Sequence, residues 1–227
     1  LNTYAPVLFT EHRGTASFYS EGDTALDYYI LLGDTLDAVV SGYRLLTGKA
    51  SMLPKWASGY IQALERYETG EEMLDTAREY RRRGLGLDCI VLDWNSWEGD
   101  QWGQKTLDHT RFPDPPALTE ALHDLDVKMM VSIWPSLSET AADFREFQAA
   151  GKMLPMSNGY NAFDSAAREM YWKQANTGLF QNGIDAWWCD SSEPVTAEWN
   201  HENEPSPHRV YEEYLAQSSA MMPYALC

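Results

Sequence analysis

An acidic side chain directly follows an apolar run late in the chain, a pattern typical of a catalytic strand end. Residues 186–189 (AWWC) are small, apolar or aromatic, Asp190 follows them, and Glu193 comes three residues later. A carboxylate held at the end of a rigid, buried strand is well placed to act as a nucleophile. The alternative is that Asp190 and the serines after it cap a helix or close a turn. We predict that Asp190 is a catalytic nucleophile, with capping as the competing interpretation.

Three earlier apolar runs also end in acids or tryptophans. The residues at these ends are Glu65 and Arg66; Asp93, Trp94, Asn95 and Trp97; and Trp134. The carboxyl ends of parallel strands meet at one edge, so these side chains should converge with Trp188 and Asp190. Because side chains alternate along a strand, Trp188 and Asp190 should point the same way. Trp187 and Cys189 should point into the layer between strand and helix, which makes Cys189 a packed thiol.

Carboxylates beside aromatic rings suit glycoside hydrolysis, in which one carboxylate attacks the anomeric carbon and another protonates the leaving oxygen. A hydrolytic metal site would need clustered histidine and carboxylate ligands, and the five histidines are scattered along the chain. A serine hydrolase of the α/β type would need a Gly-X-Ser-X-Gly turn, which does not occur. The sequence therefore predicts a sugar-cleaving site with no metal and no cofactor.

The charge balance excludes several classes of partner. The 227 residues contain 34 acidic and 17 basic side chains, for a formal net charge of -17. Most of this surface would repel a nucleic-acid backbone or an anionic membrane, and no run of about 18 apolar residues predicts a membrane span. Three cysteines without metal-ligand spacing indicate a reduced thiol protein, and hence a cytoplasmic location, with secretion as the alternative.

The pattern from Trp56 onward alternates strand and helix. Apolar runs predict strands at residues 57–64, 87–94, 127–134 and 184–189. Helical spacing predicts helices at residues 70–83, 115–125, 139–150, 165–181 and 210–222. Strands buried on both faces and followed by helices indicate parallel β/α units, and four such units fit the first half of a (β/α)8 TIM barrel. The alternative, a doubly wound nucleotide-binding sheet, lacks its glycine-rich first turn.

The first part of the chain has a different pattern. Short β-like runs at residues 6–10, 16–19 and 26–32 precede a helix-like segment at 34–46, which ends at Thr47-Gly48. We therefore assign residues 1–46 to the end of an N-terminal β-sandwich and a connecting helix, and residues 47–227 to the first half of the barrel. A start without Met and an abrupt end lead us to expect a piece of a longer polypeptide.

Five blocks together resemble the signatures of glycoside hydrolase family 31. They are residues 48–57 (GKASMLPKWA), 92–97 (LDWNSW), 111–115 (RFPDP), 132–135 (SIWP) and 187–194 (WWCDSSEP). They occur in the family's order and cover most of the chain. The resemblance implies a retaining α-glycosidase or α-transglycosylase in which a β-sandwich precedes a (β/α)8 barrel and further β domains follow it.

The resemblance also implies roles for individual residues. Asp190 matches the nucleophile, Asp93 matches a carboxylate that binds sugar hydroxyls, and tryptophans line the subsite for the cleaved sugar: Trp94, Trp134 and Trp188. The family's acid/base lies after a later strand, outside this chain, so Glu193 is expected to orient the loop in support of the site, with direct ligand contact as the alternative. Asp-Ser-Ser-Glu-Pro departs from the Asp-Met-Asn-Glu of many members, so contacts made by that Met are not carried over.

These observations lead to one functional hypothesis. The full-length protein is expected to hydrolyse terminal non-reducing α-linked sugars through a glycosyl-enzyme intermediate on Asp190, and residues 1–227 alone are expected to be inactive. An α-glucosidase or α-xylosidase type is favoured, and an α-galactosidase or α-N-acetylgalactosaminidase type is also compatible. The alternatives are a transglycosylase of the same fold and a homologue that binds carbohydrate without cleaving it. The expected partners are an α-glycoside or oligosaccharide and the rest of the polypeptide.

Overall fold

The computed structural model describes residues 7–20, 28–154 and 158–190, which fall into two compact units divided between Leu53 and Pro54. In the first unit, strands β1 (Val7–His12) and β2 (Thr15–Ser20) form an antiparallel hairpin. Its two-residue turn, Arg13-Gly14, has positive φ at both positions (51° and 80°), as tight hairpins require. The predicted helix is α1 (Leu36–Thr47), where the Ala38 N–H donates to the Thr35 hydroxyl at 3.2 Å.

One predicted β-like run in this unit is wrong over its described part. Residues 28–32 form no strand, and the side chains of Tyr29 and Leu32 are 69% and 86% exposed. An apolar run becomes a strand only when a neighbouring strand satisfies its backbone groups, and no described strand lies beside this one. The hairpin and α1 are what the structure describes here, and a β-sandwich stays a proposal.

The second unit is built on a parallel sheet with its strands in sequence order, β3-β4-β5-β6. The strands are β3 (Ile61–Leu64), β4 (Cys89–Leu92), β5 (Lys128–Ile133) and β6 (Ala186–Cys189). A doubly wound sheet reverses its strand order at a switch point, whereas a barrel adds each strand beside the previous one. The described strands therefore follow the order of a barrel, as predicted.

Each α-helix of this unit starts close to its predicted position. The 3₁₀ helix η1 (Lys55–Ser58) takes the first residues of the predicted strand at 57–64. The remaining elements are α2 (Gly70–Arg82), α3 (Pro115–Asp124), α4 (Ala142–Ala149), α5 (Ser165–Gly178) and the 3₁₀ helix η2 (Phe180–Asn182). The caps Thr69, Asp114 and Asp164 accept backbone N–H groups of the helices that follow them. The helix predicted at 210–222 lies outside the described residues.

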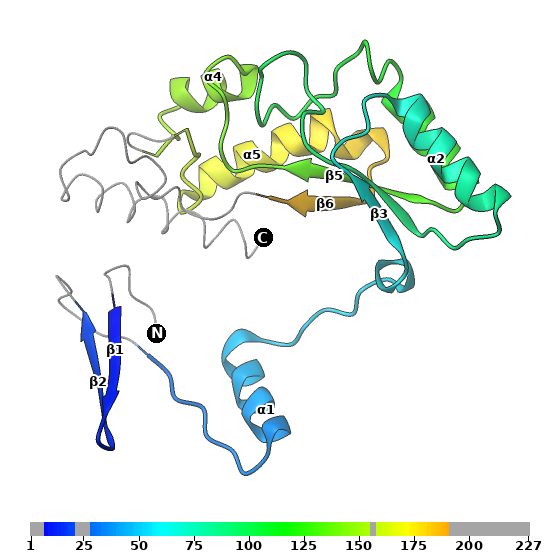
Figure 1. The fold of residues 1–227 in the computed structure, drawn as a ribbon. Coiled ribbons are helices and arrows are strands. Elements are labelled where there is room, and N and C mark those ends of the chain that lie inside the picture. Colours follow the sequence, from blue (N-terminus) through cyan, green and yellow to red (C-terminus); the bar gives the residue numbers. More distant parts are fainter. Residues whose placement is uncertain (1–6, 21–27, 155–157, 191–227) are drawn as a thin grey trace. The chain divides into compact units, whose positions relative to one another are not determined.

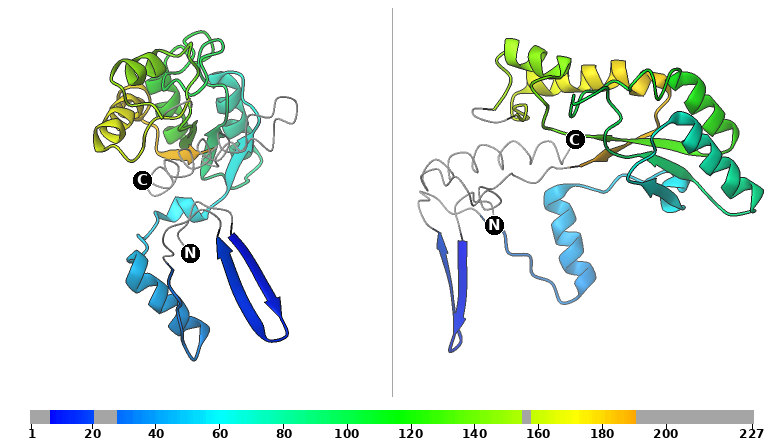
Figure 2. Two further views of the ribbon diagram at one scale, coloured as in Figure 1. Left: turned by 90° about the vertical axis from the view of Figure 1, so that its left-hand side faces the viewer. Right: turned by 45° about the horizontal axis from the view of Figure 1, so that its top comes forward.

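The core lies between the sheet and its helices, which gather on one side of the strands (Figures 1 and 2). Alternate strand residues such as Ile90, Leu92 and Val131 are fully buried in this layer. Trp187 also points into it, with its ring 6.1 Å from that of Trp172, as the alternation predicts. The prediction that Cys189 is a packed thiol is wrong, because this last residue of β6 is exposed.

Asp185 anchors the amino-terminal edge of the sheet. Its carboxylate accepts the Met129 N–H at 3.0 Å and lies 2.7 Å from His123 Nε2 and 3.1 Å from Lys128 Nζ. Burial acts to raise the pKa of Asp185, but the hydrogen bonds from His123, Met129 and Lys128 outweigh it and lower the pKa. This edge is opposite to the strand ends predicted to carry chemistry, so Asp185 ties β6 to β5 and α3.

We predict that Asp185→Asn lowers the free energy of unfolding of the full-length protein by about 1–3 kcal/mol at neutral pH, because charged hydrogen bonds to a half-buried group are lost. The folded pKa lies below the unfolded value, so this stability is present at neutral pH and disappears as the pH falls through the folded pKa. Urea unfolding at several pH values measures both effects. The exposed Asp124→Asn is the control, and equal stability of Asp185→Asn and wild type at neutral pH would contradict the prediction.

Candidate active site

The register of the sheet brings three candidate side chains to one level. Leu92 pairs with Val131 and Ser132 pairs with Trp188, so Asp93, Ser132 and Trp188 lie beside one another at the carboxyl edge. The Ser132 hydroxyl donates to Asp93 Oδ1 at 2.5 Å, which fixes the orientation of that carboxylate. Sequence reasoning missed Ser132, although its polarity within an otherwise apolar strand was a visible signal.

The turn after β4 has a strained backbone. Trp94 and Asn95 have positive φ angles of 39° and 46°, a conformation uncommon for residues other than glycine. Such strain persists only where the surroundings enforce it, and it concentrates at functional sites. Here the Trp94 N–H lies 3.4 Å from the Ser132 hydroxyl oxygen, and Arg111 Nη2 donates to the carbonyls of Asn95 (2.6 Å) and Trp97 (2.7 Å).

Arg111 is itself held by Asp108. Its Nε donates to Asp108 Oδ2 at 3.0 Å, and Asp108 also accepts the N–H groups of Thr110 and Arg111. Partial burial acts to raise the pKa of Asp108, and these hydrogen bonds outweigh it, so the pKa is lowered. The RFPDP block thus has a structural use: Arg111 clamps the strained turn, Phe112 enters the core and Asp114 caps α3.

Four tryptophans cluster at this edge. Ring centroids lie 5.1 Å apart for Trp97 and Trp134, 5.3 Å for Trp97 and Trp102, 5.2 Å for Trp102 and Trp134, and 6.4 Å for Trp94 and Trp102. Trp134 is only 1% exposed, while Trp94 and Trp102 are half-buried. The indole N–H groups of Trp94 and Trp134 have no acceptor among the described residues. Sequence reasoning did not identify Trp102, because it lies in a loop rather than at a strand end.

Asp190 extends the ladder one residue beyond β6, since its N–H donates to the Ile133 carbonyl at 3.1 Å. It is half-buried, and Trp188, two residues earlier, is 41% exposed on the face opposite to Trp187. Glu65 and Arg66 follow β3 and are joined by a cis peptide bond. Glu193 lies outside the described residues. The structure therefore places Asp93, Trp94, Trp134, Trp188 and Asp190 along one carboxyl edge.

Within the described ranges, no three histidine, cysteine or acidic side chains come together in a way that could hold a metal ion. The helices of the described ranges are also too short or too polar to cross a membrane.

The chain matches a known enzyme family over most of its length. Residues 50–224 fit the profile of the glycosyl hydrolases family 31 TIM-barrel domain. This chain belongs to glycosyl hydrolase family 31. Its parallel strands β3–β6 are accordingly part of the family's barrel, as the sequence blocks predicted.

Several relatives are similar over most of this chain. The α-xylosidase of Saccharolobus solfataricus is 38% identical over 184 residues, which make up 81% of this chain and 25% of that protein. An uncharacterised family 31 glucosidase of Pseudescherichia vulneris is 30% identical, over 78% of this chain and 36% of that protein. The chain thus spans only about a quarter to a third of the length of these two relatives.

Solved α-xylosidase structures of family 31 are also similar over most of this chain, which covers less than a third of each of them. The enzyme from Xanthomonas citri is 37% identical with a TM-score of 0.71, over 84% of this chain and 23% of that one. An α-xylosidase from a soil metagenome, solved with xylose, is 28% identical with a TM-score of 0.72, over 86% of this chain and 30% of that one.

We predict that Arg111→Lys loosens the turn after β4, because an ammonium cannot reproduce the planar guanidinium fork that holds two carbonyls and Asp108. The expected loss in unfolding free energy of the full-length protein is about 1–3 kcal/mol, with faster proteolysis within residues 93–97. Arg145→Lys is the control, since that exposed side chain reaches a single carbonyl, Thr140, at 3.2 Å. Unchanged stability and proteolysis in Arg111→Lys would refute the clamp.

Proposed function

We propose that the full-length protein is a retaining α-glycoside hydrolase that removes terminal non-reducing α-linked sugars, with Asp190 as nucleophile. The observation that carries the proposal is the shared carboxyl edge of a family 31 barrel segment, where Asp93 follows β4, Trp188 lies near the end of β6 and Asp190 follows β6. Because a barrel's chemistry takes place at that edge, this shared position supports the proposal that these residues meet one ligand.

In the proposed reaction, a carboxylate oxygen of Asp190 attacks the anomeric carbon as the bond to the leaving oxygen breaks. The leaving oxygen receives a proton from a general acid that we expect beyond this chain. The resulting glycosyl ester has the inverted configuration, and water, activated by the same group acting as base, then restores the original one. An acceptor sugar in place of that water would give transglycosylation.

Asp93 is proposed to accept hydrogen bonds from sugar hydroxyls. One of its oxygens accepts the Ser132 hydroxyl, which fixes the carboxylate, and the other oxygen is proposed to accept from the sugar. Trp94, Trp134 and Trp188 are proposed to line the same subsite, and the geometry adds Trp102 to this group.

The relatives favour an α-xyloside as the substrate. Two solved relatives are α-xylosidases, one of them solved with xylose, and the α-xylosidase of Saccharolobus solfataricus is 38% identical. We propose α-xylosides first and α-glucosides second. We also propose that residues 1–46 belong to a β-sandwich and connecting helix, residues 47–227 to the first half of the barrel, and that turnover needs the rest of the polypeptide.

The nucleophile is tested by Asp190→Asn in the full-length protein. We expect kcat for aryl α-xylosides to fall by about 10³-fold or more, because a neutral amide cannot form the covalent intermediate. A mechanism-based label should attach to Asp190 in the wild type. The control is Asp124→Asn, which removes an exposed acid at the end of α3. Comparable turnover by Asp190→Asn and wild type would exclude Asp190 as nucleophile.

The support of Asp93 is tested by Ser132→Ala. Loss of one hydrogen bond to a charged group should raise KM by roughly tenfold, with a smaller effect on kcat, because Asp93 is no longer held in place. Ser165→Ala, at an exposed first position of α5, provides the matched substitution without a contact at the site. An unchanged KM in Ser132→Ala would show that Asp93 needs no such support.

A further inference from the structure

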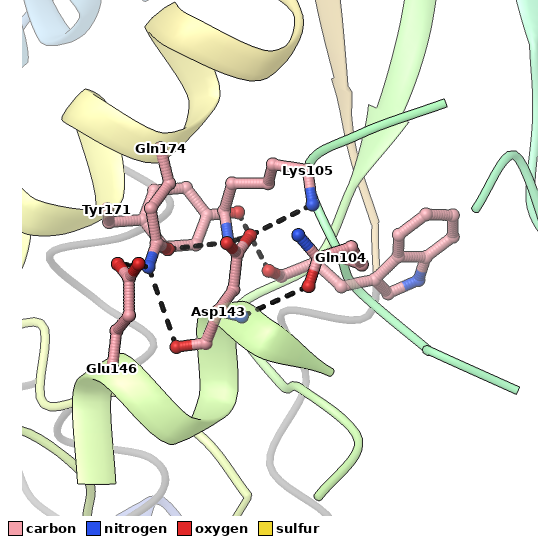
Figure 3. Close-up of polar contacts among 7 residues, drawn as sticks. Gln104, Lys105, Asp143, Glu146, Tyr171 and Gln174 are labelled. Carbon is pink, nitrogen blue, oxygen red and sulfur yellow. Dashed lines mark hydrogen bonds and ion pairs between the residues drawn. The ribbon is translucent and has the colours of Figure 1, made fainter. Parts of the chain in front are cut away.

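A lysine is fully buried behind the tryptophan cluster. Lys105 is 2% exposed and lies in the loop between β4 and α3, three residues after Trp102. Its ammonium is 3.5 Å from Asp143 Oδ2 of α4 and 3.4 Å from Gln174 Oε1 of α5. It also lies 4.1 Å from the centre of the Tyr171 ring, a cation–π geometry. Figure 3 shows these side chains converging from the loop and both helices.

Tyr171 connects this lysine to the strand end. Its hydroxyl donates to the backbone carbonyl of Trp134 at 2.7 Å, so a side chain of α5 holds the residue that follows β5. The ring of Tyr171 is fixed on its other side by Tyr160, whose centroid is 4.5 Å away in a stacked arrangement. The contacts from Lys105 through Tyr171 therefore end at Trp134, a member of the tryptophan cluster.

The same network fixes the loop that carries Trp102. The Lys105 N–H donates to Asp143 Oδ2 at 2.9 Å, and the Asp143 N–H donates to Gln104 Oε1 at 3.0 Å. Gly178 of α5 packs so closely that a Cβ there would lie 1.7 Å from the Lys105 carbonyl oxygen. The loop is thus held between α4 and α5 directly after Trp102, at a point where α5 has no room for a larger residue.

Stability alone does not explain a buried lysine. The cost of removing two charges from water commonly matches or exceeds their attraction, and apolar replacements of such pairs are often neutral or stabilising. The Lys105–Asp143 pair instead joins elements in a fixed geometry. The Lys105 ammonium lies over the ring of Tyr171 in α5, and Asp143 of α4 binds the backbone N–H of Lys105 and the side chain of Gln104 in the loop. Its contribution is therefore to the placement of the loop and of the strand end.

We propose that Lys105 and Tyr171 are positioning residues that set the places of Trp102 and Trp134, and through them the aromatic wall of the sugar site. The expected effect on kinetics rests on the proposed function. The positions of the tryptophans, in contrast, can be measured without any turnover. Neither residue is expected to touch the sugar, since both lie behind the cluster in the core.

The test compares Tyr171→Phe with wild type in the full-length protein. Losing the bond to the Trp134 carbonyl should raise KM for an aryl α-xyloside about two- to tenfold with little change in kcat, the scale of one hydrogen bond. The far-ultraviolet exciton circular dichroism of the coupled tryptophans should change with it. Tyr80→Phe is the control, because it removes a hydroxyl that donates to Gln62 Oε1 at 2.8 Å, away from the cluster.

Failure of the positioning role differs from failure of the proposed function. Unchanged exciton signal and KM in Tyr171→Phe, or the same change in Tyr80→Phe, would overturn the positioning role. If the wild type does not cleave α-glycosides, the missing activity counts against the proposed function alone. An exciton change confined to Tyr171→Phe would still support the positioning of the tryptophans.

A second variant, Lys105→Met, uses pH as the readout. Burial lowers the pKa of Lys105 to about 8, opposed by the charges of Asp143 and Glu146. Those two acids face it from α4, and Tyr171 and Gln174 face it from α5. The wild-type exciton signal should therefore change as the pH rises through about 8, while that of Lys105→Met stays constant.

The contribution of Lys105 to the stability of the fold should increase across that pH range. Between about 8 and 10.5 the unfolded chain binds more protons at this lysine than the folded one, so its contribution to the unfolding free energy rises with pH. If the wild-type exciton signal changes over this pH range while stability does not fall, the change reflects the positions of the tryptophans and not unfolding. A wild-type signal that is flat across this range, or an inflection that persists in Lys105→Met, would refute the role of Lys105.

Discussion

Parallel pairing in strict sequence order is the constraint on which the site depends. Because β4, β5 and β6 run side by side in one direction, residues that follow each of them in the chain emerge at the same edge. One register then sets which side chains share a level, and a slip by one residue would turn Ser132 and Trp188 into the helix layer. The ion pairs and hydrogen bonds of Asp185 at the opposite edge help to hold that register.

The carboxyl edge is held by polar side chains from a loop, a strand and a helix. Arg111 fixes the strained turn after β4, Ser132 fixes Asp93, and Tyr171 fixes the carbonyl after β5. Each contact restrains a backbone or carboxylate group that a strand end leaves without a regular partner. The result is a rigid rim in which strain at Trp94 and Asn95 is tolerated because its neighbours leave no alternative.

Much of the fold could be predicted from local patterns. The four strands and the helices α2, α3 and α5 begin within a few residues of their predicted positions, because apolar periodicity and capping residues such as Thr69 and Asp114 act locally. Two predictions failed, at residues 28–32 and at Cys189, and both concern burial. Burial depends on what covers an element, which its own sequence does not specify.

The sequence by itself determined the family, the alternation of strands and helices, and the identity of the strand-end residues, including Asp93 and Asp190. The tertiary structure alone decided that Ser132 holds Asp93, that Trp102 joins the cluster and that Lys105 is buried behind it. These contacts join residues 32 to 69 positions apart. Local periodicity fixes which face a residue occupies, whereas register and the close packing of loops and helices decide which distant partner it meets.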